Sequence, residues 1–135
     1  MNFSKSFNNI AEEYVYRIWD KKDLHAIKDL LHPQIVIHSL LGDYYGQEAM
    51  KKVVEAWLVA FPNLVVTNKA VVCEKDLVVI QWQAQGTHQG EFKNIKPTGK
   101  SVIYEGVTIY KISNNRIVEY WAYLDMQHLL NQISA

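Results

Sequence analysis

The sequence predicts an α+β domain in which helices come first and an antiparallel sheet follows. Through most of residues 4–61, apolar side chains recur every three or four positions, which is the spacing of an amphipathic helix. From residue 64 onward the period falls to about two, which is the spacing of a strand. The runs on either side of Asn114 and Asn115 indicate a long hairpin, because Asn tolerates the left-handed backbone of a tight turn. This order predicts helices segregated on one face of a curved sheet.

The first half of the chain is predicted to be mainly helical. Its expected elements are helices over 4–20, 23–32 and 50–61, with a strand over 34–39 and a loop over 40–46. Ser4 and Asp23 are candidate caps for the first two helices. Pro33 and Pro62 end the second and third, because the residue before a proline is pushed out of helical angles.

The second half is predicted to be mainly strand. Its expected elements are strands over 64–73 and 77–88, a connection over 89–100, the hairpin over 101–126 and a closing helix over 126–133. Val, Ile, Tyr and Trp dominate the hairpin, and these residues suit a pleated surface.

The register of the hairpin decides which side chains share a face. With a two-residue turn, counting outward pairs Ile112 with Ile117 and Tyr104 with Asp125. Trp121 then lies on the same face as Tyr104 and Asp125. The opposite face is largely apolar and carries Val107, Ile109, Tyr120, Ala122 and Leu124. Both faces therefore need cover, one from helices over a pocket and the other from a second layer such as a second subunit.

The composition predicts one soluble domain over residues 1–135. A hydrophobic content of 49% supports a core and argues against disorder. Lys plus Arg and Asp plus Glu both number 14, so no strong attraction to nucleic acid or to an anionic membrane is expected. Cys73 is the single cysteine and lacks the accompanying ligands of a metal site. The N-terminus also lacks the apolar core of a signal peptide, so we expect a cytoplasmic protein without metal.

Three stretches resemble the SnoaL-like polyketide cyclases and their uncharacterised ester-cyclase-like relatives, which share the cone-shaped fold of nuclear transport factor 2. They are GQEAMKKVVEAWLVAFPNL at 46–64, GTHQGEFKNIKPTGKSV at 86–102 and RIVEYWAYLDMQHLLNQI at 116–133. The resemblance implies N-terminal helices packed on a curved, mainly antiparallel sheet, a short C-terminal helix and a pocket between them. It also implies a homodimer through the outer sheet face, and aldol ring closure by an acidic residue without metal or cofactor.

Asp125 is the position that resembles the acid/base carboxylate of this family. In the register above it lies among aromatic side chains, where desolvation suits a carboxylate to proton transfer. Asp is also a preferred N-cap, and Asp125 directly precedes the predicted helix MQHLL. A catalytic role and a capping role are therefore both open.

Two histidines are candidate partners for Asp125 in catalysis. His38 ends the strand IVIHS, and similarity to ketosteroid isomerases, which share this fold, suggests that it faces the pocket mouth. His88 lies between Gly86 and Gly90, where a bend would turn its ring toward the pocket. Each could instead have a structural role. His38 could be hydrogen-bonded to the backbone, and His88 could be part of a turn.

Further side chains are predicted to form the wall of a pocket for a flat, ring-containing ligand, as aromatic residues do in many small-molecule sites. The predicted ligand-binding set is Tyr14, Trp57, Trp82, Tyr104, Thr108, Trp121 and Tyr123. Aromatic residues at helical or strand spacing also form ordinary cores, so only a cavity distinguishes the two interpretations.

The leading hypothesis is a cofactor-free enzyme that binds a hydrophobic, oxygenated, polyketide-like molecule and catalyses acid/base cyclisation or isomerisation. Asp125 would move the proton, helped by His38 or His88. The alternative is a non-catalytic binding or dimerisation module, which predicts a narrow or filled cavity and an Asp125 engaged by backbone amides. A third hypothesis, an isomerase or hydrolase, would need a second acid or a positioned water near Asp125. A homodimer through the apolar sheet face is expected in each case.

Overall fold

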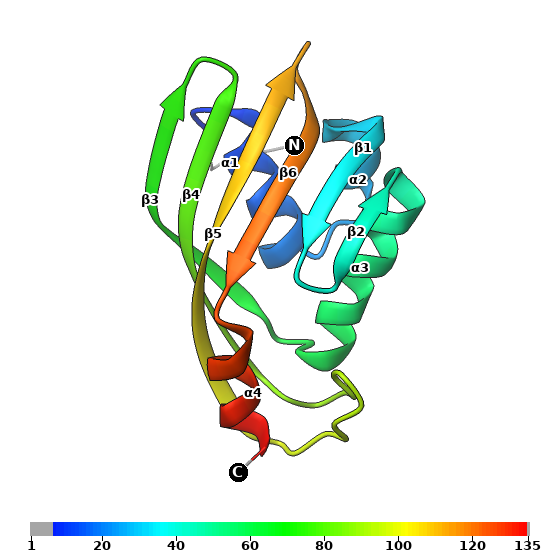
Figure 1. Cartoon of the computed structure of the whole chain (residues 1–135), viewed down its shortest axis with the longest axis vertical. Coiled ribbons are helices and arrows are strands. Elements are labelled where there is room, and N and C mark those ends of the chain that lie inside the picture. The colour runs from blue at the N-terminus through cyan, green and yellow to red at the C-terminus, as the bar shows by residue number, and fades with distance from the viewer. Residues whose placement is uncertain (1–6, 135) are drawn as a thin grey trace.

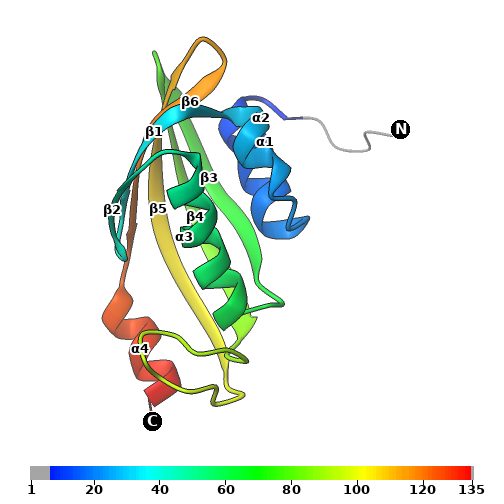
Figure 2. The ribbon, with the colours of Figure 1, turned by 90° about the vertical axis from the view of Figure 1, so that its right-hand side faces the viewer.

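A curved six-stranded sheet carries helices on one face, as the two side views show (Figures 1 and 2). The computed structural model describes residues 7–134. Its strands are β1 (Leu31–Ser39), β2 (Gly42–Tyr45), β3 (Val65–Glu74), β4 (Leu77–Thr87), β5 (Ser101–Ser113) and β6 (Arg116–Leu124). Across the sheet the order is β2-β1-β6-β5-β4-β3, in which β1 and β6 are parallel and the other neighbours are antiparallel. The predicted α+β class is confirmed.

Helices precede and follow the sheet. They are α1 (Ile10–Val15), the π-helical turn η1 (Tyr16–Asp20), α2 (His25–Leu30), α3 (Gln47–Ala60) and α4 (Met126–Ser134). The Asn9 side chain caps α1 by accepting a 2.9 Å hydrogen bond from the Glu12 amide, whereas Ser4 lies outside the described residues. Within residues 7–134, none of the helices is long and apolar enough to cross a membrane.

The β5–β6 hairpin contains a bulge that corrects the predicted register. The turn residues Asn114 and Asn115 both have positive φ, and Ile112 pairs with Ile117 as predicted. Lys111 then pairs with Glu119, so Val118 is an extra residue on β6 and every later pair moves by one position. From Glu119 onward, the side chains of β6 consequently lie on the opposite face of the sheet from the one predicted.

This shift exchanges the two predicted faces of β6. The partner of Thr108 is Ala122 rather than Trp121, and Leu124 pairs with Gly106. The prediction that Tyr104 faces Asp125 is therefore wrong, because β6 ends at Leu124. Three residues assigned to the outer face are also corrected, because they lie on the inner face under the helices: Tyr120, Ala122 and Leu124.

Residues 40–46, predicted as a loop, contain the short edge strand β2. It pairs with β1 from Val36 opposite Tyr45 to Ser39 opposite Gly42. Gly42 has a φ of 134°, which favours glycine at this tight connection. Only the presence of β1 as a neighbour makes this polar, aromatic segment a strand.

The hydrophobic core lies between the helices and the inner face of the sheet. Tyr14 and Ile18 enter it from the first helical segment, Met50 from α3 and Ile80 from β4, and all four are almost fully buried. Each such side chain contributes about 1.5–3 kcal/mol by leaving water. The same burial brings aromatic side chains from the helices and the sheet close together, and this is where a cavity forms.

Candidate functional site

A cavity of about 80 Å³ lies between the helices and the inner face of the sheet. This volume accommodates several water-sized groups but is narrow for a ligand pocket. Its wall combines aromatic and aliphatic side chains with few polar atoms, and includes Tyr14, Trp19, Met50, Trp57, Trp82, Tyr104, Thr108, Tyr110, Tyr120 and Leu124. Leu40, which is 38% exposed, belongs to the same wall, so the cavity reaches the surface there.

Five of the seven predicted ligand-binding residues line this cavity: Tyr14, Trp57, Trp82, Tyr104 and Thr108. Trp121 and Tyr123 do not line it, because the bulge in β6 places them on the outer face. Two tyrosines are among the cavity residues that sequence reasoning missed. Tyr110 lies on the same face of β5 as Tyr104 and Thr108, because alternate residues of a strand share a face, so the sequence pattern could have identified it. Tyr120 had no such signal, since its face depends on the bulge.

Tyr14 lines the cavity and carries a buried polar atom that has no partner among the described residues. Its side chain is about 1% exposed, and among residues 7–134 no group bonds its hydroxyl. Burial, followed by the nearby phenols of Tyr120 and Tyr110, raises the pKa of Tyr14 well above its ordinary value. The hydroxyl therefore keeps its proton at neutral pH and is available as a hydrogen-bond donor.

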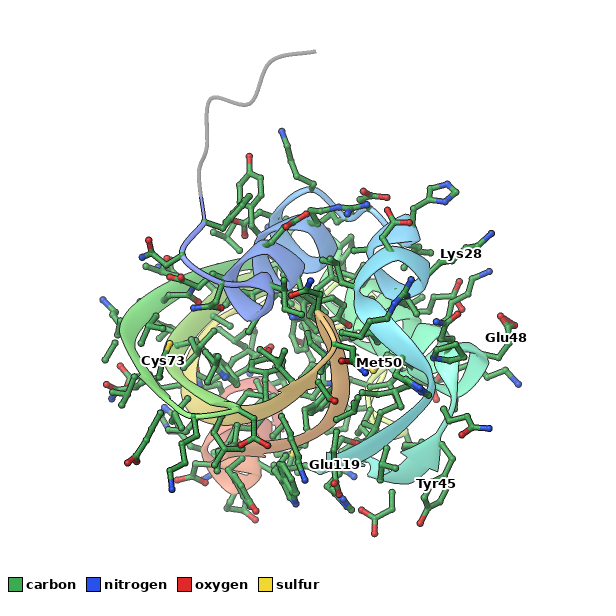
Figure 3. The ribbon with its side chains drawn as sticks, turned by 90° about the horizontal axis from the view of Figure 1, so that it is seen from above. Lys28, Tyr45, Glu48, Met50, Cys73 and Glu119 are labelled. Atoms are coloured by element: carbon green, nitrogen blue, oxygen red, sulfur yellow. The ribbon has the colours of Figure 1, made fainter. Side chains whose placement is uncertain are left out.

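The neighbouring tyrosines are protonated for the same reason. Burial raises the pKa values of Tyr104, Tyr110 and Tyr120 above the ordinary phenol range. The Tyr120 hydroxyl donates to the Met50 sulfur at 3.1 Å, and Met50 lies in the interior in the view from above (Figure 3). Among the described residues that line the cavity, none is a carboxylate or an imidazole. The wall thus offers proton donors and apolar surface.

Trp82 is held in the cavity wall by its neighbours on β5. Its indole Nε1 donates a 2.9 Å hydrogen bond to the Thr108 hydroxyl. Gly106 lies opposite Trp82, and a Cβ at this position would be 2.4 Å from the indole ring. The absence of a side chain at Gly106 therefore lets the indole lie across β5, which sets the shape of this wall.

Asp125 lies at the N-terminus of α4 and does not line the cavity. Its side chain is exposed and accepts a 3.0 Å hydrogen bond from the His128 amide, which is the geometry of a helix cap. The preceding residue, Leu124, is part of the cavity wall. Asp125 therefore follows a cavity residue in the sequence, but its carboxylate points to the N-terminus of α4.

His38 lies on the outer face of the sheet, between two carboxylates. Its Nε2 is 2.8 Å from Glu119 and its Nδ1 is 3.2 Å from Asp43. The ring also stacks on Trp121, with centroids 5.5 Å apart. Hydrogen bonding to Glu119, and then to Asp43, raises the pKa of His38 above its ordinary value despite partial desolvation. The sequence pattern did not reveal these partners, because β1 and β6 are far apart in the chain.

His88 is fully buried and anchors the 88–100 connection. Its Nδ1 accepts a 3.2 Å hydrogen bond from the Thr98 amide and is 3.0 Å from the Thr98 hydroxyl. Its ring packs against Phe61, and its Nε2 has no partner within residues 7–134. His88 is not part of the cavity wall. The structure thus places Asp125, His38 and His88 in three separate environments.

The donor set does not resemble a metal centre. Among the described residues, no group of three or more His, Cys, Asp or Glu side chains is placed to hold a metal ion. Cys73 is exposed and its sulfur accepts from the Asn9 side chain at 3.6 Å.

Comparisons with known proteins agree with this arrangement. The family model described as SnoaL-like polyketide cyclase matches residues 9–133. AclR, a proposed hydroxylase from Streptomyces galilaeus, is 31% identical over 93% of this chain and 92% of its own, with a TM-score of 0.82. Among the curated proteins, none matches the chain.

Two further solved structures share the fold. A proposed SnoaL-like polyketide cyclase from a Jannaschia species is 22% identical, with 99% of both chains covered and a TM-score of 0.85. IdmH, a proposed polyketide cyclase from Streptomyces antibioticus, is 24% identical over 92% of this chain and 98% of its own, with a TM-score of 0.77.

Proposed function

Because the chain belongs to the SnoaL-like polyketide cyclase family, we propose that its cavity binds a hydrophobic, oxygen-bearing small molecule of polyketide-like chemistry. The observation that carries this proposal is the Tyr14 hydroxyl, which is buried without a partner in the described residues and belongs to a side chain that lines the cavity. Leaving such a group unpaired costs about 1–3 kcal/mol. A ligand carbonyl or ether oxygen that accepted from Tyr14 would recover much of this cost.

The shape of the cavity supports a flat, partly inserted ligand. At about 80 Å³ it holds one ring more readily than a folded polycyclic chain. Trp57 and Tyr104, whose rings are stacked with centroids 6.0 Å apart, contribute to the wall. The rest of a larger ligand would extend past Leu40 into solvent.

Acid/base cyclisation or isomerisation without a cofactor is the second candidate function, and family membership favours it. In such a reaction a carbonyl gains negative charge as an enolate forms, and a protonated Tyr14 would donate to that oxygen. Asp125, next in the chain to Leu124 in the cavity wall, is our candidate for the proton acceptor. Its use would require the carboxylate to leave the His128 amide.

Binding without catalysis needs fewer assumptions than this second candidate. The cavity is narrow, Asp125 caps α4, and His38 is bonded to Glu119 on the opposite face of the sheet. These are the features expected of a ligand-binding module. We therefore assign ligand binding to the cavity as the function that its geometry supports best.

Tyr14→Phe tests the assignment, because it removes the hydroxyl and keeps the ring. The bicyclic ketone 1-indanone and its oxygen-free counterpart indane are suitable probes, with Trp57 and Trp82 in the cavity wall as fluorescent reporters. We expect Tyr14→Phe to weaken indanone binding about fivefold, the loss of roughly one neutral hydrogen bond, and to leave indane binding unchanged. Equal affinities of the two probes for the unaltered protein would overturn the assignment.

The control for this experiment is Asp125→Asn, which keeps an oxygen to cap α4 and removes the acid. It should bind both probes as the unaltered protein does, since the carboxylate does not line the cavity. Altered binding, or loss of turnover of a substrate identified later, would instead support the catalytic candidate.

A homodimer through the outer face of the sheet is also part of our proposal. Ile103 and Tyr123 are 47% and 54% exposed there, and Val107 and Ile109 are partly exposed. An apolar face of this kind is typical of an interface between subunits. Tyr123 and Trp121 replace the three β6 residues first assigned to the interface.

Analytical ultracentrifugation at micromolar concentration tests the dimer. We expect the unaltered chain to sediment as a dimer and Tyr123→Glu to sediment as a monomer, because a charge would be buried at the contact. The matched control is Val59→Glu, since Val59 is 61% exposed on α3 on the opposite side of the sheet. A monomeric unaltered chain would rule out this interface.

A further inference from the structure

A second hollow, which we call the basic groove, lies at the opposite end of β1 and β6 from the cavity mouth. It has a volume of about 560 Å³, within the range of small-molecule sites. β1 contributes His32 from its N-terminal end, whereas the cavity wall takes Ser39 and the following Leu40 from the other end of that strand. The groove and the cavity share no lining residue.

The groove is lined by side chains that donate hydrogen bonds. Lys28 comes from α2, His32 from β1 and Arg116 from β6. The Asn114 turn and Gln47 at the start of α3 complete much of its wall. None of the described residues that line it is acidic. Two chain segments distant in sequence, 28–32 and 114–116, therefore bring cationic or donor groups to one hollow.

Arg116 is oriented by backbone carbonyls rather than by an acid. Its Nη1 donates to the carbonyl oxygens of Lys28 at 2.9 Å and Leu31 at 3.1 Å. Its Nε and Nη2 have no hydrogen-bond partner in the described part of the chain. A guanidinium held in this way presents its remaining donors in a fixed direction, which suits an oxyanion.

His32 is oriented in a similar manner. Its Nδ1 accepts a 3.0 Å hydrogen bond from the Gln34 amide, so the proton of the neutral ring lies on Nε2. Nε2 is thus a donor in either protonation state, without a partner among residues 7–134. Lys28 is exposed and forms no ion pair with a described residue, and it projects from the periphery in Figure 3.

The acidic side chains nearby are engaged elsewhere or lie outside the groove. Asp29, next to Lys28 in α2, binds Arg17 at 2.8 Å. Glu119 on β6 binds His38 at 2.8 Å. Glu48 follows Gln47 in α3 but is not part of the groove wall, and it also projects outward in Figure 3. The positive charge of Lys28 and Arg116 is therefore not neutralised within the groove.

We propose that the basic groove binds the phosphate group of a small organic phosphate. A phosphate dianion has three terminal oxygens, which can accept separately from Arg116, Lys28 and His32. The volume leaves space for an organic group beside the phosphate. This site is independent of the function proposed for the cavity, since the two hollows share no wall.

The test is a titration with inorganic phosphate followed by two-dimensional NMR of backbone amides, at constant ionic strength set with chloride. We expect saturable shifts confined to amides near His32, Ser113 and Arg116. Lys28→Gln should weaken binding about threefold to fivefold, because one exposed ionic contact is lost. The control Lys69→Gln removes the same charge from exposed β3 and should not change the affinity.

Two results would overturn the proposal. The first is a shift that grows linearly with phosphate, or an equal loss in the two lysine variants, because either means non-specific attraction. The second is tighter binding of succinate than of phosphate at the same ionic strength, which would identify a carboxylate site instead. Tyr14→Phe should leave the phosphate titration unchanged, so failure of the cavity assignment and failure of this one are distinguishable.

Discussion

Replacing Gly106 by Ala is expected to lower the free energy of unfolding by about 3 kcal/mol, at the upper end of the cost of overpacking. The new Cβ would lie 2.4 Å from Cζ2 of Trp82 and 2.4 Å from the carbonyl oxygen of Tyr123. The first contact forces the indole away from Thr108, and the second forces β6 away from β5. Urea denaturation followed by tryptophan fluorescence measures the loss, and indane binding measures the altered cavity.

The two contacts of Gly106 can be separated with a second substitution. Trp82→Leu in the Gly106→Ala background removes the indole and leaves the contact with the Tyr123 carbonyl. Gly106→Ala should therefore cost less stability in the Trp82→Leu background than in the unaltered protein. An unchanged unfolding midpoint for Gly106→Ala would show that β5 and β6 are not in close contact here.

Gly90→Ala is expected to cost about 3 kcal/mol or more, because the contact involves backbone that cannot rotate away. Its Cβ would lie 2.0 Å from the carbonyl oxygen of Val59 and 2.7 Å from the carbonyl carbon. The Gln89 and Gly90 amides also donate to the Ala60 carbonyl at 3.0 and 3.2 Å. The substitution should therefore separate the 88–100 connection from the end of α3, as faster hydrogen exchange of these amides would show.

Gly99→Ala is the matched control in the same connection. Apart from its two chain neighbours, no described residue has an atom within 4 Å of its added Cβ, but its φ of 73° is unfavourable for a side chain. We expect a loss of only about 1 kcal/mol, the ordinary cost of a left-handed residue. Equal losses for Gly90→Ala and Gly99→Ala would mean that backbone conformation, and not contact with α3, sets the cost.

Gly106 and Gly90 lie where the backbone is most tightly packed in and beside the candidate site. Gly106 positions Trp82 in the cavity wall, and Gly90 joins the 88–100 connection to α3. His88 strengthens the same connection, since its backbone exchanges hydrogen bonds with Lys100 and Gly99 at 2.9 and 2.8 Å. We therefore interpret His88 as an anchor of the connection beside an aromatic cluster.

Local pattern was sufficient for several of the residues that line the candidate cavity. Alternation along β5 predicts that Tyr104 and Thr108 share one face of the hairpin, and both line the cavity. Tyr14 and Trp57 followed from helical spacing, and both line it too. In each case one regular element decides the direction of the side chain, so no knowledge of its neighbours is required.

The Asp125 alternatives show where local pattern was insufficient. Both a cap and a pocket carboxylate fit the sequence DMQHLL, and the choice depends on which face of β6 leads into α4. That face depends on the bulge at Val118, which leaves no mark in the composition of the strand. The same bulge moved Trp121 and Tyr123 from the predicted cavity wall to the outer face.

By itself the sequence determined the α+β class, the order of the helices and strands apart from β2, the turn at Asn114 and Asn115, and the family, because these depend on periodicity and local backbone preference. Only the tertiary structure decided the parallel pairing of β1 with β6, the edge strand β2, the face of β6 and the volume of the cavity. These depend on contacts between segments far apart in the chain. A single extra residue in one strand inverts a face without changing any local preference.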